Sequence, residues 1–550
     1  MAASYLSKLN PVPAFAEYTG PYKVGTVDVE IPVDELDSPA PAPEGTNIET
    51  VHFRIFYPAH PESKGKKITW LPAPQRHTLS AYVQFLGAGP LLAEAVSFLP
   101  RHLHYTTIPA IKNAPLLEPN TPNKRWPTAI FSHGLGGNRN AYSQVTGALA
   151  SHGVVVICPE HRDGSAVASF VRIPSEQNRY FMKDRQRQIL YKRIPHDATD
   201  EVHDARNAQL RIRLWEMGLI HDAVLAIDQG LKKINLNTST PSLDQFAGRM
   251  NVHQPGSIIF AGHSFGATTA VQFLKSVYYA RLPEVANMTR PLYKPSPDSS
   301  ICRQVTPENV TMLLDMWCFP LLAKCTKTLF DLPLPVYADD ASAPGGNGLV
   351  AIESDAFYKW KEHLHATARI LSPDPSAAVV ETKAFERPSG IKLSEPNFFY
   401  VHNSAHLNQS DFGVLFPWLT KKVFGSAEPE RVLRLNLRAM LQALRINNVP
   451  IGRTWVGDLI DGSPEGKLSA AENKGQNDGT HDDKAIFDRN GNSGVEAWSW
   501  IDIVGLGDKL GDFGVTNKTD VETQEPEMAG EIEPQMSEGE AVKTVVSAST

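Results

Sequence analysis

Cysteine is scarce in this chain of 550 residues, with only Cys158, Cys302, Cys318 and Cys325 present. None of them forms a Cys-x-x-Cys pair or a spacing used by zinc ligands, which argues against a metal ribbon or a disulfide scaffold. We therefore expect reduced thiols, packed mostly as small apolar side chains, in an intracellular, cytoplasmic protein.

Long apolar runs are missing as well. No segment offers about eighteen consecutive apolar residues, so we expect no transmembrane helix. Residues 1–20 contain no unbroken apolar run, and the sequence therefore predicts no secretory signal peptide. Positive charge is not in excess either, because 53 Lys and Arg face 60 Asp and Glu, a net charge of −7. This balance argues against nucleic acid as a partner.

The most informative stretch is Ser257–Gln272, with the sequence SIIFAGHSFGATTAVQ. Ile258–Ala261 predicts a buried strand, Ala267–Phe273 predicts a helix, and Gly-His-Ser-Phe-Gly joins them. A Gly-x-Ser-x-Gly between a strand and a helix is typical of the nucleophile elbow of α/β-hydrolases. Its glycines leave room for a strained turn that presents the hydroxyl of Ser264 at the carboxyl end of a strand. The alternative is a serine-containing turn without chemistry.

The rest of the chain alternates strands and helices, which indicates an α/β-hydrolase fold with a mostly parallel central sheet and helices on both faces. Strands are predicted at Thr26–Ile31, Glu49–Tyr57, Pro127–His133, Val154–Cys158, Ile258–Ala261, Val310–Leu314, Gly348–Ile352 and Asn397–His402. Helices are predicted at Tyr142–His152, Asp197–Leu231, Ala267–Phe273, Ala356–Ala368 and Arg431–Ile446.

The composition also predicts the domain boundaries. We expect a flexible N-terminus over residues 1–20 and a catalytic domain over 21–460, with insertions near 165–195 and 283–303. Residues 461–550 are of low complexity, and the last thirty contain seven Glu, one Lys and no aromatic residue. Such a composition predicts a largely disordered acidic tail. Only the tryptophan-containing part of the tail, within residues 485–515, is expected to dock back on the body.

A serine hydroxyl needs a base to remove its proton as it attacks. In α/β-hydrolases the partners follow in the order Ser, acid, His. His406 fits the base, because it follows the last predicted core strand, whereas His402 still belongs to that strand. The acid is either Asp315, which we favour, or Asp355, since each ends a predicted strand. Such an aspartate orients the imidazole and stabilises the imidazolium.

The oxyanion formed during the reaction needs two backbone donors. One is the N–H of Phe265, directly after the nucleophile, and the other comes from the His-Gly-Leu-Gly loop, for which we choose Leu135. His133 is expected to brace this loop and not to act as a base. This chemistry predicts neither a metal nor another cofactor.

An apolar stretch with almost no charge runs from Leu79 to Leu103, which predicts one or two helices broken at Gly87–Pro90. It is either a cap buried on the core or a surface that touches lipid. The candidates for lipid contact are Tyr82, Phe85, Leu86, Leu91 and Leu92.

Several motifs together resemble the platelet-activating-factor acetylhydrolases of the plasma type: GHSFGATT, FSHGLGGNRNAYS, EHRDGSA, LLDMWCFPL and SAHLNQSDF. The similarity covers roughly residues 20–445. It implies a calcium-independent esterase that removes short or oxidised sn-2 acyl chains from phospholipids at a membrane surface. By position, the family's triad falls on Ser264, Asp315 and His406, and its oxyanion donors fall on Leu135 and Phe265.

Three functions are therefore considered. The leading one is a serine esterase acting on phospholipids through an acyl-enzyme. The others are a soluble carboxylesterase for small non-lipid esters, and a non-catalytic α/β-hydrolase scaffold that binds partners. The sequence leaves the oligomeric state open.

Overall fold

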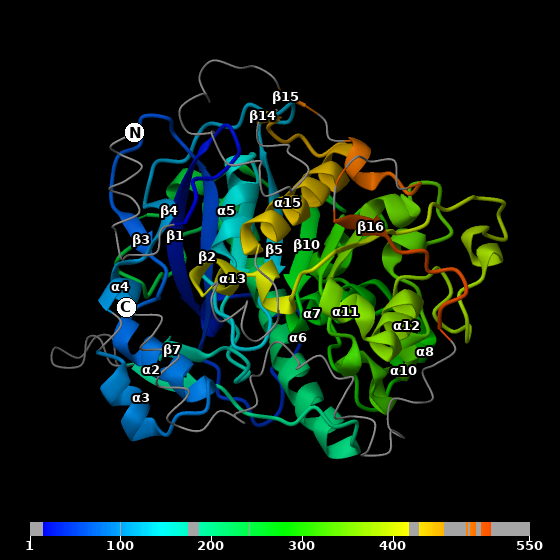
Figure 1. The fold of residues 1–550 in the computed structure, drawn as a ribbon, viewed down its shortest axis with the longest axis horizontal. Helices are drawn as coiled ribbons and strands as arrows, with labels where there is room; N and C mark the ends of the chain where they lie inside the picture. Colours follow the sequence, from blue (N-terminus) through cyan, green and yellow to red (C-terminus); the bar gives the residue numbers. More distant parts are fainter. Residues whose placement is uncertain are drawn as a thin grey trace.

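In the computed structural model, the residues described are 15–98, 101–173, 186–240, 242–416, 428–455, 480–481, 484–490, 495 and 497–507. A central sheet crosses the whole body (Figure 1). Its strands, in spatial order, are β16 (Trp498–Trp500), β13 (Asn397–Val401), β12 (Leu349–Ser354), β11 (Thr311–Leu314), β10 (Ile258–His263), β5 (Trp126–Ser132), β6 (Val155–Pro159), β2 (Thr50–Ala59), β1 (Lys23–Pro32), β4 (Thr107–Lys112) and β3 (Lys67–Thr69), with β9 (Met250–Asn251) beside β5.

The six strands from β6 to β13 are parallel, whereas β1 and β2 form an antiparallel pair and β16 is antiparallel to β13. Smaller pairs are β7 (Ala168–Arg172) with β8 (Gln186–Leu190), and β14 (Thr454–Trp455) with β15 (Thr480–His481). A parallel sheet entered through an antiparallel pair, with an elbow after its central strand, confirms the predicted α/β-hydrolase fold.

Helices cover both faces of the sheet (Figure 1). The helices are α2 (Gln75–Phe85), α3 (Pro90–Val96), α4 (Arg101–Tyr105), α5 (Ser143–Ser151), α6 (Asp200–Asp228), α7 (Phe265–Tyr278), α8 (Pro283–Ala286), α9 (Ser300–Gln304), α10 (Lys327–Phe330), α11 (Asp355–Lys359), α12 (Lys361–Ile370), α13 (Asp411–Leu415) and α15 (Pro429–Ile446). Among the described residues, none of these helices has the length and apolar character that a membrane span requires.

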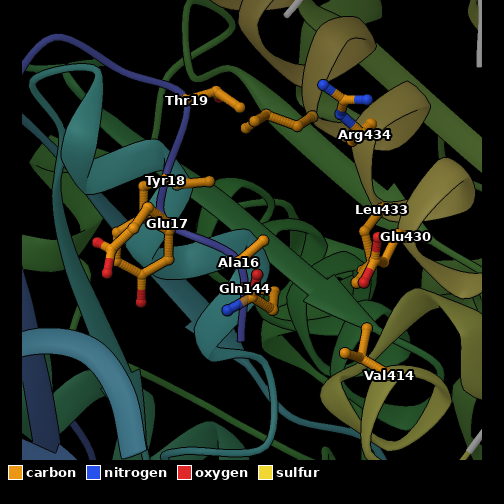
Figure 2. Close-up of a pocket in the computed structure, with 11 residues that line it drawn as sticks. Ala16, Glu17, Tyr18, Thr19, Gln144, Val414, Glu430, Leu433 and Arg434 are labelled. Carbon is orange, nitrogen blue, oxygen red and sulfur yellow. The ribbon is translucent and has the colours of Figure 1, made fainter. Parts of the chain in front are cut away.

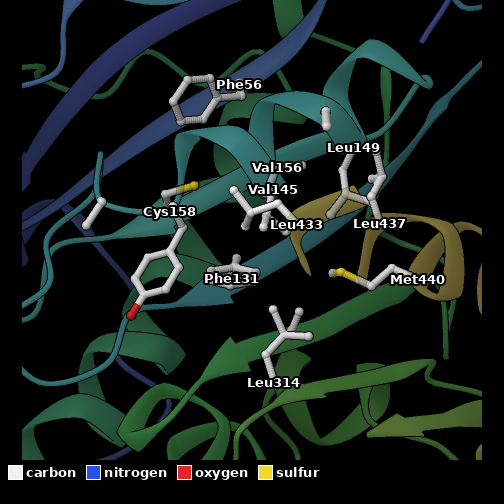
Figure 3. Packing of buried hydrophobic residues seen from close by; sticks show 14 of the residues in the cluster. Phe56, Phe131, Val145, Leu149, Val156, Cys158, Leu314, Leu433, Leu437 and Met440 are labelled. Atoms are coloured by element: carbon white, nitrogen blue, oxygen red, sulfur yellow. The ribbon is translucent and has the colours of Figure 1, made fainter. Parts of the chain in front are cut away.

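The core strands are apolar in sequence because both of their faces are buried. Phe131 of β5 packs with Leu149 of α5 and Met440 of α15 on one face, as Figure 3 shows. Ile130, the preceding residue, points to the other face and belongs to the cluster that contains Leu214 of α6. Successive residues of a strand thus fill two separate cores, one above and one below the sheet.

The N-terminal segment is more ordered than predicted. Residues 1–14 lie outside the described residues, but Tyr18 is buried and donates a hydrogen bond from its hydroxyl to Ser143 O at 3.1 Å. Phe15 is buried as well. A small pocket of about 50 Å³ lies where this segment meets α5 and α15, lined in part by Tyr18, Gln144 and Leu433 (Figure 2). Residues 15–20 therefore belong to the folded body, in contrast to the flexible segment predicted for 1–20.

The expectation that the tryptophan-containing segment within residues 485–515 docks back on the body is confirmed. Trp498 lies in β16, stacks on Phe399 with ring centroids 5.0 Å apart, and donates from Nε1 to Ile486 O at 2.8 Å. The strand β16 thereby extends the central sheet next to β13. Part of the predicted tail is consequently integral to the fold, while residues 508–550 lie outside the described residues.

Because Trp498 is buried at this edge, we expect Trp498→Ala to lower the free energy of unfolding by about 3–5 kcal/mol, the cost of truncating a large aromatic core residue. Denaturant unfolding measures the loss. Trp500→Ala is the matched control, since Trp500 is only half-buried and should cost less. An unchanged midpoint for Trp498→Ala would contradict the assignment of β16 to the folded body.

Candidate active site

Ser264 lies between the end of β10 and the start of α7, with φ 55° and ψ −122°. This backbone conformation is strained for a residue with a side chain. A Cβ on Gly262 would lie 2.4 Å from the carbonyl carbon of Gly266, and a Cβ on Gly266 would lie 2.0 Å from Ser132 O. Only glycine fits at both positions, so the turn has the geometry predicted for a nucleophile elbow.

His406 and Asp315 meet at the same edge of the sheet. Asp315 directly follows β11, and His406 begins a short 3₁₀ helix, η9 (His406–Gln409), after β13. The carboxyl ends of parallel strands share one edge, which brings the two residues together across 91 positions of sequence. His406 Nδ1 and Asp315 Oδ2 are 2.9 Å apart, and Asp315 Oδ1 accepts a hydrogen bond from Ser354 N at 2.5 Å. Both side chains are buried.

Asp355, the alternative acid, contacts a lysine and not a histidine. It begins α11, where its Oδ2 pairs with Lys359 Nζ at 2.6 Å, one helical turn away. An aspartate in the first turn of a helix and an i,i+4 pair with lysine are both ordinary helix-stabilising contacts. The structure thus brings Asp315, and not Asp355, to His406.

Aromatic rings enclose the imidazole of His406. Phe357 stacks on it with ring centroids 4.5 Å apart and an interplanar angle of 3°, and His263 lies against it at 4.3 Å. Burial lowers the pKa of His406 and raises the pKa of Asp315, because each charged form loses its hydration. The lowered pKa leaves the imidazole neutral near pH 7, the form that a general base requires.

The predicted oxyanion loop packs directly against the serine. A Cβ on Gly134 would lie 3.0 Å from Ser264 Cβ. Gly136 N donates to Ser165 O at 2.8 Å, and Gly134 N donates to the hydroxyl of Tyr142 at 3.1 Å. Within the part of the chain that the structure describes, the hydrogen bonds of this loop leave the Leu135 N–H unused.

The second predicted donor, Phe265, is the first residue of α7. The N–H groups of the first helical turn have no partner inside the helix and carry the positive end of its dipole. The amides of Leu135 and Phe265 are therefore both available to a negatively charged oxygen. His133 does not act as a base: its Nε2 accepts from His161 N at 3.1 Å, which fits the bracing role predicted for it.

Tyr142 connects the oxyanion loop with the imidazoles. Its hydroxyl accepts from Gly134 N and lies 2.8 Å from His263 Nδ1. The hydroxyl of Tyr142 thus links the amide of the loop with the imidazole of His263. Burial lowers the pKa of His263, so this ring also stays neutral.

A ring nitrogen of His263, a ring nitrogen of His406 and a carboxylate oxygen of Asp315 all lie within 4.8 Å of one another, close enough to be considered as metal ligands. Both Nδ1 atoms, however, are already hydrogen-bonded within the protein, to Asp315 and to Tyr142. A metal bound at Nδ1 of His406 would displace its contact with Asp315, the contact that orients the imidazole in an acid–base pair.

The lipid-facing candidates fall into different environments. Tyr82 is buried, stacks on Trp70 at 5.7 Å, and accepts a hydrogen bond from Asn138 Nδ2 at 2.6 Å. The prediction that Tyr82 faces lipid is therefore wrong, because the inner side of α2 packs on the core. Phe85 is half-buried and packs edge-on against Tyr191 at 4.8 Å.

The break at Gly87–Pro90 is present and separates α2 from α3. Leu86 and Leu92 are half-buried, and Leu92 packs on a small cluster beneath α3. Leu91, by contrast, is 88% exposed, and Phe98 just beyond α3 is 56% exposed although it was not among the candidates. Two of the large exposed apolar side chains, Leu91 and Phe98, thus lie on or next to α3.

Sequence reasoning missed Asp411, although it lies in the SAHLNQSDF motif. Its buried carboxylate accepts from Ser143 N and Gln144 N at 2.9 Å each, and from Trp70 Nε1 at 3.1 Å. Asp411 therefore caps the N-terminus of α5 from the start of α13, directly after the 3₁₀ helix that begins with His406. The sequence does show an aspartate five residues after the predicted base. No sequence pattern, however, indicates which helix this aspartate caps.

Comparison with known proteins agrees with the resemblance found in the motifs. The model of the family described as "Platelet-activating factor acetylhydrolase, isoform II" matches residues 10–334, more than half of the chain. The chain is 28% identical over 452 residues to a Schizosaccharomyces pombe protein named "Putative phospholipase A2", covering 78% of this chain and 92% of that protein.

Two mammalian proteins named platelet-activating factor acetylhydrolase also match. The identity is 28% over 255 residues for Cavia porcellus (46% of this chain, 51% of that protein) and 30% over 221 residues for Canis lupus familiaris (40% and 46%). The chain thus spans about half the length of these mammalian relatives. A solved ferulic acid esterase from Streptomyces cinnamoneus aligns at 14% identity over 79% of this chain and 92% of that one, and its TM-score of 0.41 is too low to support an inference.

The geometry separates the two candidate acids experimentally. We expect Asp315→Asn to slow the labelling of Ser264 by a fluorophosphonate by about 10⁴, the loss typical of a triad without its acid. Asp355→Asn is the matched control and should label at the rate of the unmodified protein, because Asp355 pairs with Lys359. Mass spectrometry of the adduct measures both labelling rates. Slow labelling of Asp355→Asn together with normal labelling of Asp315→Asn would assign the acid to Asp355.

Proposed function

Because this chain belongs to the family of platelet-activating factor acetylhydrolases, isoform II, we propose that it is a serine esterase that removes short or oxidised acyl chains from the sn-2 position of phospholipids. The observation that carries the proposal is the 2.9 Å contact of His406 with Asp315 at the sheet edge where the strained turn of Ser264 also ends. The relatives' names, phospholipase A2 and platelet-activating factor acetylhydrolase, support an sn-2 ester as the substrate.

In this mechanism Ser264 Oγ attacks the ester carbonyl while His406 Nε2 takes its proton. The N–H groups of Leu135 and Phe265 donate to the oxyanion of the tetrahedral intermediate. His406 then returns the proton to the departing lysophospholipid oxygen, which leaves an acyl-enzyme on Ser264. Water, deprotonated by His406, attacks the acyl-enzyme, and a short carboxylic acid is released.

Asp315 keeps its charge-stabilising role throughout this cycle. Its carboxylate bonds to Nδ1 of His406, which fixes the tautomer with a free lone pair on Nε2. When His406 takes a proton, the imidazolium forms next to this carboxylate in a site with little water, where the attraction is strong. No step requires a divalent cation, so the proposed activity is independent of calcium.

The direct test uses the purified full chain and 1-alkyl-2-acetylglycerophosphocholine in the presence of EDTA. We expect hydrolysis that Ser264→Ala lowers by about 10⁶, the loss typical of a serine hydrolase without its nucleophile. Equal rates for both proteins would end the proposal. Activity on p-nitrophenyl acetate but on no phospholipid would indicate a soluble carboxylesterase, and absence of both activity and fluorophosphonate labelling would indicate a scaffold.

We further propose that the exposed apolar residues around α3 contact the membrane surface during catalysis. Leu91 is the most exposed of these side chains, and its neighbour α2 reaches the oxyanion loop: a Cβ on Gly136 would lie 2.8 Å from the ring of Phe85. A membrane touching Leu91 would therefore lie on the side of the protein where the serine is.

Burying an exposed leucine in lipid contributes about 1.5–3 kcal/mol, so we expect Leu91→Asp to weaken vesicle binding by about tenfold or more. Hydrolysis of liposomal substrate should fall accordingly, while hydrolysis of monomeric substrate stays unchanged. The matched control is Leu231→Asp, an equally apolar residue that is 53% exposed just past α6, near Asp228, whose carboxylate accepts from Met250 N beside the first residue of β5. Equal losses on both substrates, or equal losses in both variants, would contradict membrane contact at α3.

A further inference from the structure

Arg213 lies in the middle of α6, and its guanidinium is fully buried next to the predicted oxyanion loop. Nη1 donates to His133 O at 2.8 Å, and Nη2 donates to Ser165 Oγ at 2.6 Å. Nε donates to Asp163 Oδ2 at 3.1 Å, which supplies the opposite charge. A buried guanidinium with a paired carboxylate and these hydrogen bonds has a fixed orientation, because its five N–H groups form a planar fork.

These contacts lie on both sides of Leu135 in the sequence. His133 directly precedes Gly134 of the loop, and the carbonyl oxygen of His133 accepts a hydrogen bond from Arg213. The hydroxyl of Ser165 is bonded to Arg213. The carbonyl oxygen of Ser165 accepts a hydrogen bond from Gly136 N at 2.8 Å. Arg213 thereby fixes the segment before Leu135 directly, and the segment after it through Ser165.

The same guanidinium contacts the element that carries the second donor. Its central carbon lies 4.5 Å from the ring centroid of Phe265, a cation–π arrangement, and Nη1 is 3.3 Å from Thr269 Oγ1 one turn further along α7. One planar group thus touches both the loop that contains Leu135 and the helix that begins with Phe265.

We propose that Arg213 is a positioning residue that sets the separation of the Leu135 and Phe265 amides. This inference rests on the proposed function, because it assigns a role within the same esterase site. The loop contains glycines at 134, 136 and 137 and has no side-chain packing of its own at those positions. Amides in such a loop stabilise a developing oxyanion only if they are held in place before the charge forms.

The main test is Arg213→Lys, which keeps a positive charge beside Asp163 but removes the fork. We expect kcat on a soluble acetyl ester to fall by about 10²–10³, the loss typical of one missing oxyanion donor, with KM unchanged within about threefold. A trifluoromethyl ketone, which forms an anionic tetrahedral adduct with serine, should lose affinity by the same factor as kcat/KM.

Arg206→Lys is the matched control. Arg206 is equally buried in the same helix, but it donates to Ile194 O at 2.8 Å and to Gln209 Oε1 at 3.0 Å, and its guanidinium lies 5.0 Å from the ring centroid of Trp317, whereas the guanidinium of Arg213 bonds to the loop carbonyl of His133. We expect this variant to keep kcat within about threefold. A folded Arg213→Lys with the kcat of the unmodified protein, or with a raised KM alone, would overturn the inference.

Should Arg213→Lys fail to fold, as judged by its thermal unfolding, Ser165→Ala decides the question. This change removes the hydroxyl that accepts from Nη2 and Nε while Asp163 stays in place. A kcat lowered by about tenfold with an unchanged KM supports the role of Arg213, and an unchanged kcat overturns it. Failure of the proposed function is distinguishable, because the unmodified protein would then neither hydrolyse esters nor react with a fluorophosphonate.

Discussion

The whole site depends on a contact between two stretches of backbone that only glycine permits. At Gly266 an added Cβ would lie 2.0 Å from Ser132 O, so the start of α7 rests directly on the end of β5. This contact fixes the height of the Ser264 turn above the sheet. The chain continues from Ser132 into the loop that contains Leu135, and the same contact therefore limits how far the loop amide lies from the amide of Phe265. A side chain at 266 would separate the nucleophile from the groups that receive the negative charge.

A second constraint is electrostatic. Behind the oxyanion loop, Arg213 pairs with Asp163, and Glu216 bonds to His161, which in turn contacts Ser132 Oγ at 2.8 Å. Buried charge pairs add little net stability, because removing two ions from water offsets most of their attraction. Leaving one partner alone, however, is strongly unfavourable. Such pairs hence select one arrangement of the loop over others, and their contribution here is geometric: they fix the ends of a glycine-rich segment that would otherwise adopt many conformations.

The strongest sequence patterns predicted the parts of the structure that are local. The strand–turn–helix of the elbow and the alternation of strands and helices follow from periodicity and spacing, and the fold agrees with them. Tyr82 was misassigned because an uncharged helix shows which residues are apolar but not which side is inward. Arg213, Tyr142 and Asp411 were missed because their roles depend on long-range contacts, such as those of Arg213 with His133, Tyr142 with His263 and Asp411 with Ser143. For β16 the tryptophans predicted docking on the body, but three residues are too few for a periodic signal that would place them in the central sheet.

The base is the member of the proposed triad whose position depends on the longest-range contacts. Ser264 and Asp315 end adjacent strands, and Ser264 N bonds to Leu314 O at 2.9 Å, so the parallel ladder fixes their relation. His406 lies five residues beyond β13 and has no ladder to hold it. Its loop is fixed instead by Asp411, whose carboxylate caps α5, and α5 is also the helix that follows the oxyanion loop. The base and the loop that holds the Leu135 amide are therefore both anchored to α5, whereas Phe265 belongs to α7. A shift of α5 relative to the sheet would move the group that takes the proton together with the Leu135 amide and away from the Phe265 amide, so that proton transfer and charge stabilisation would fail together.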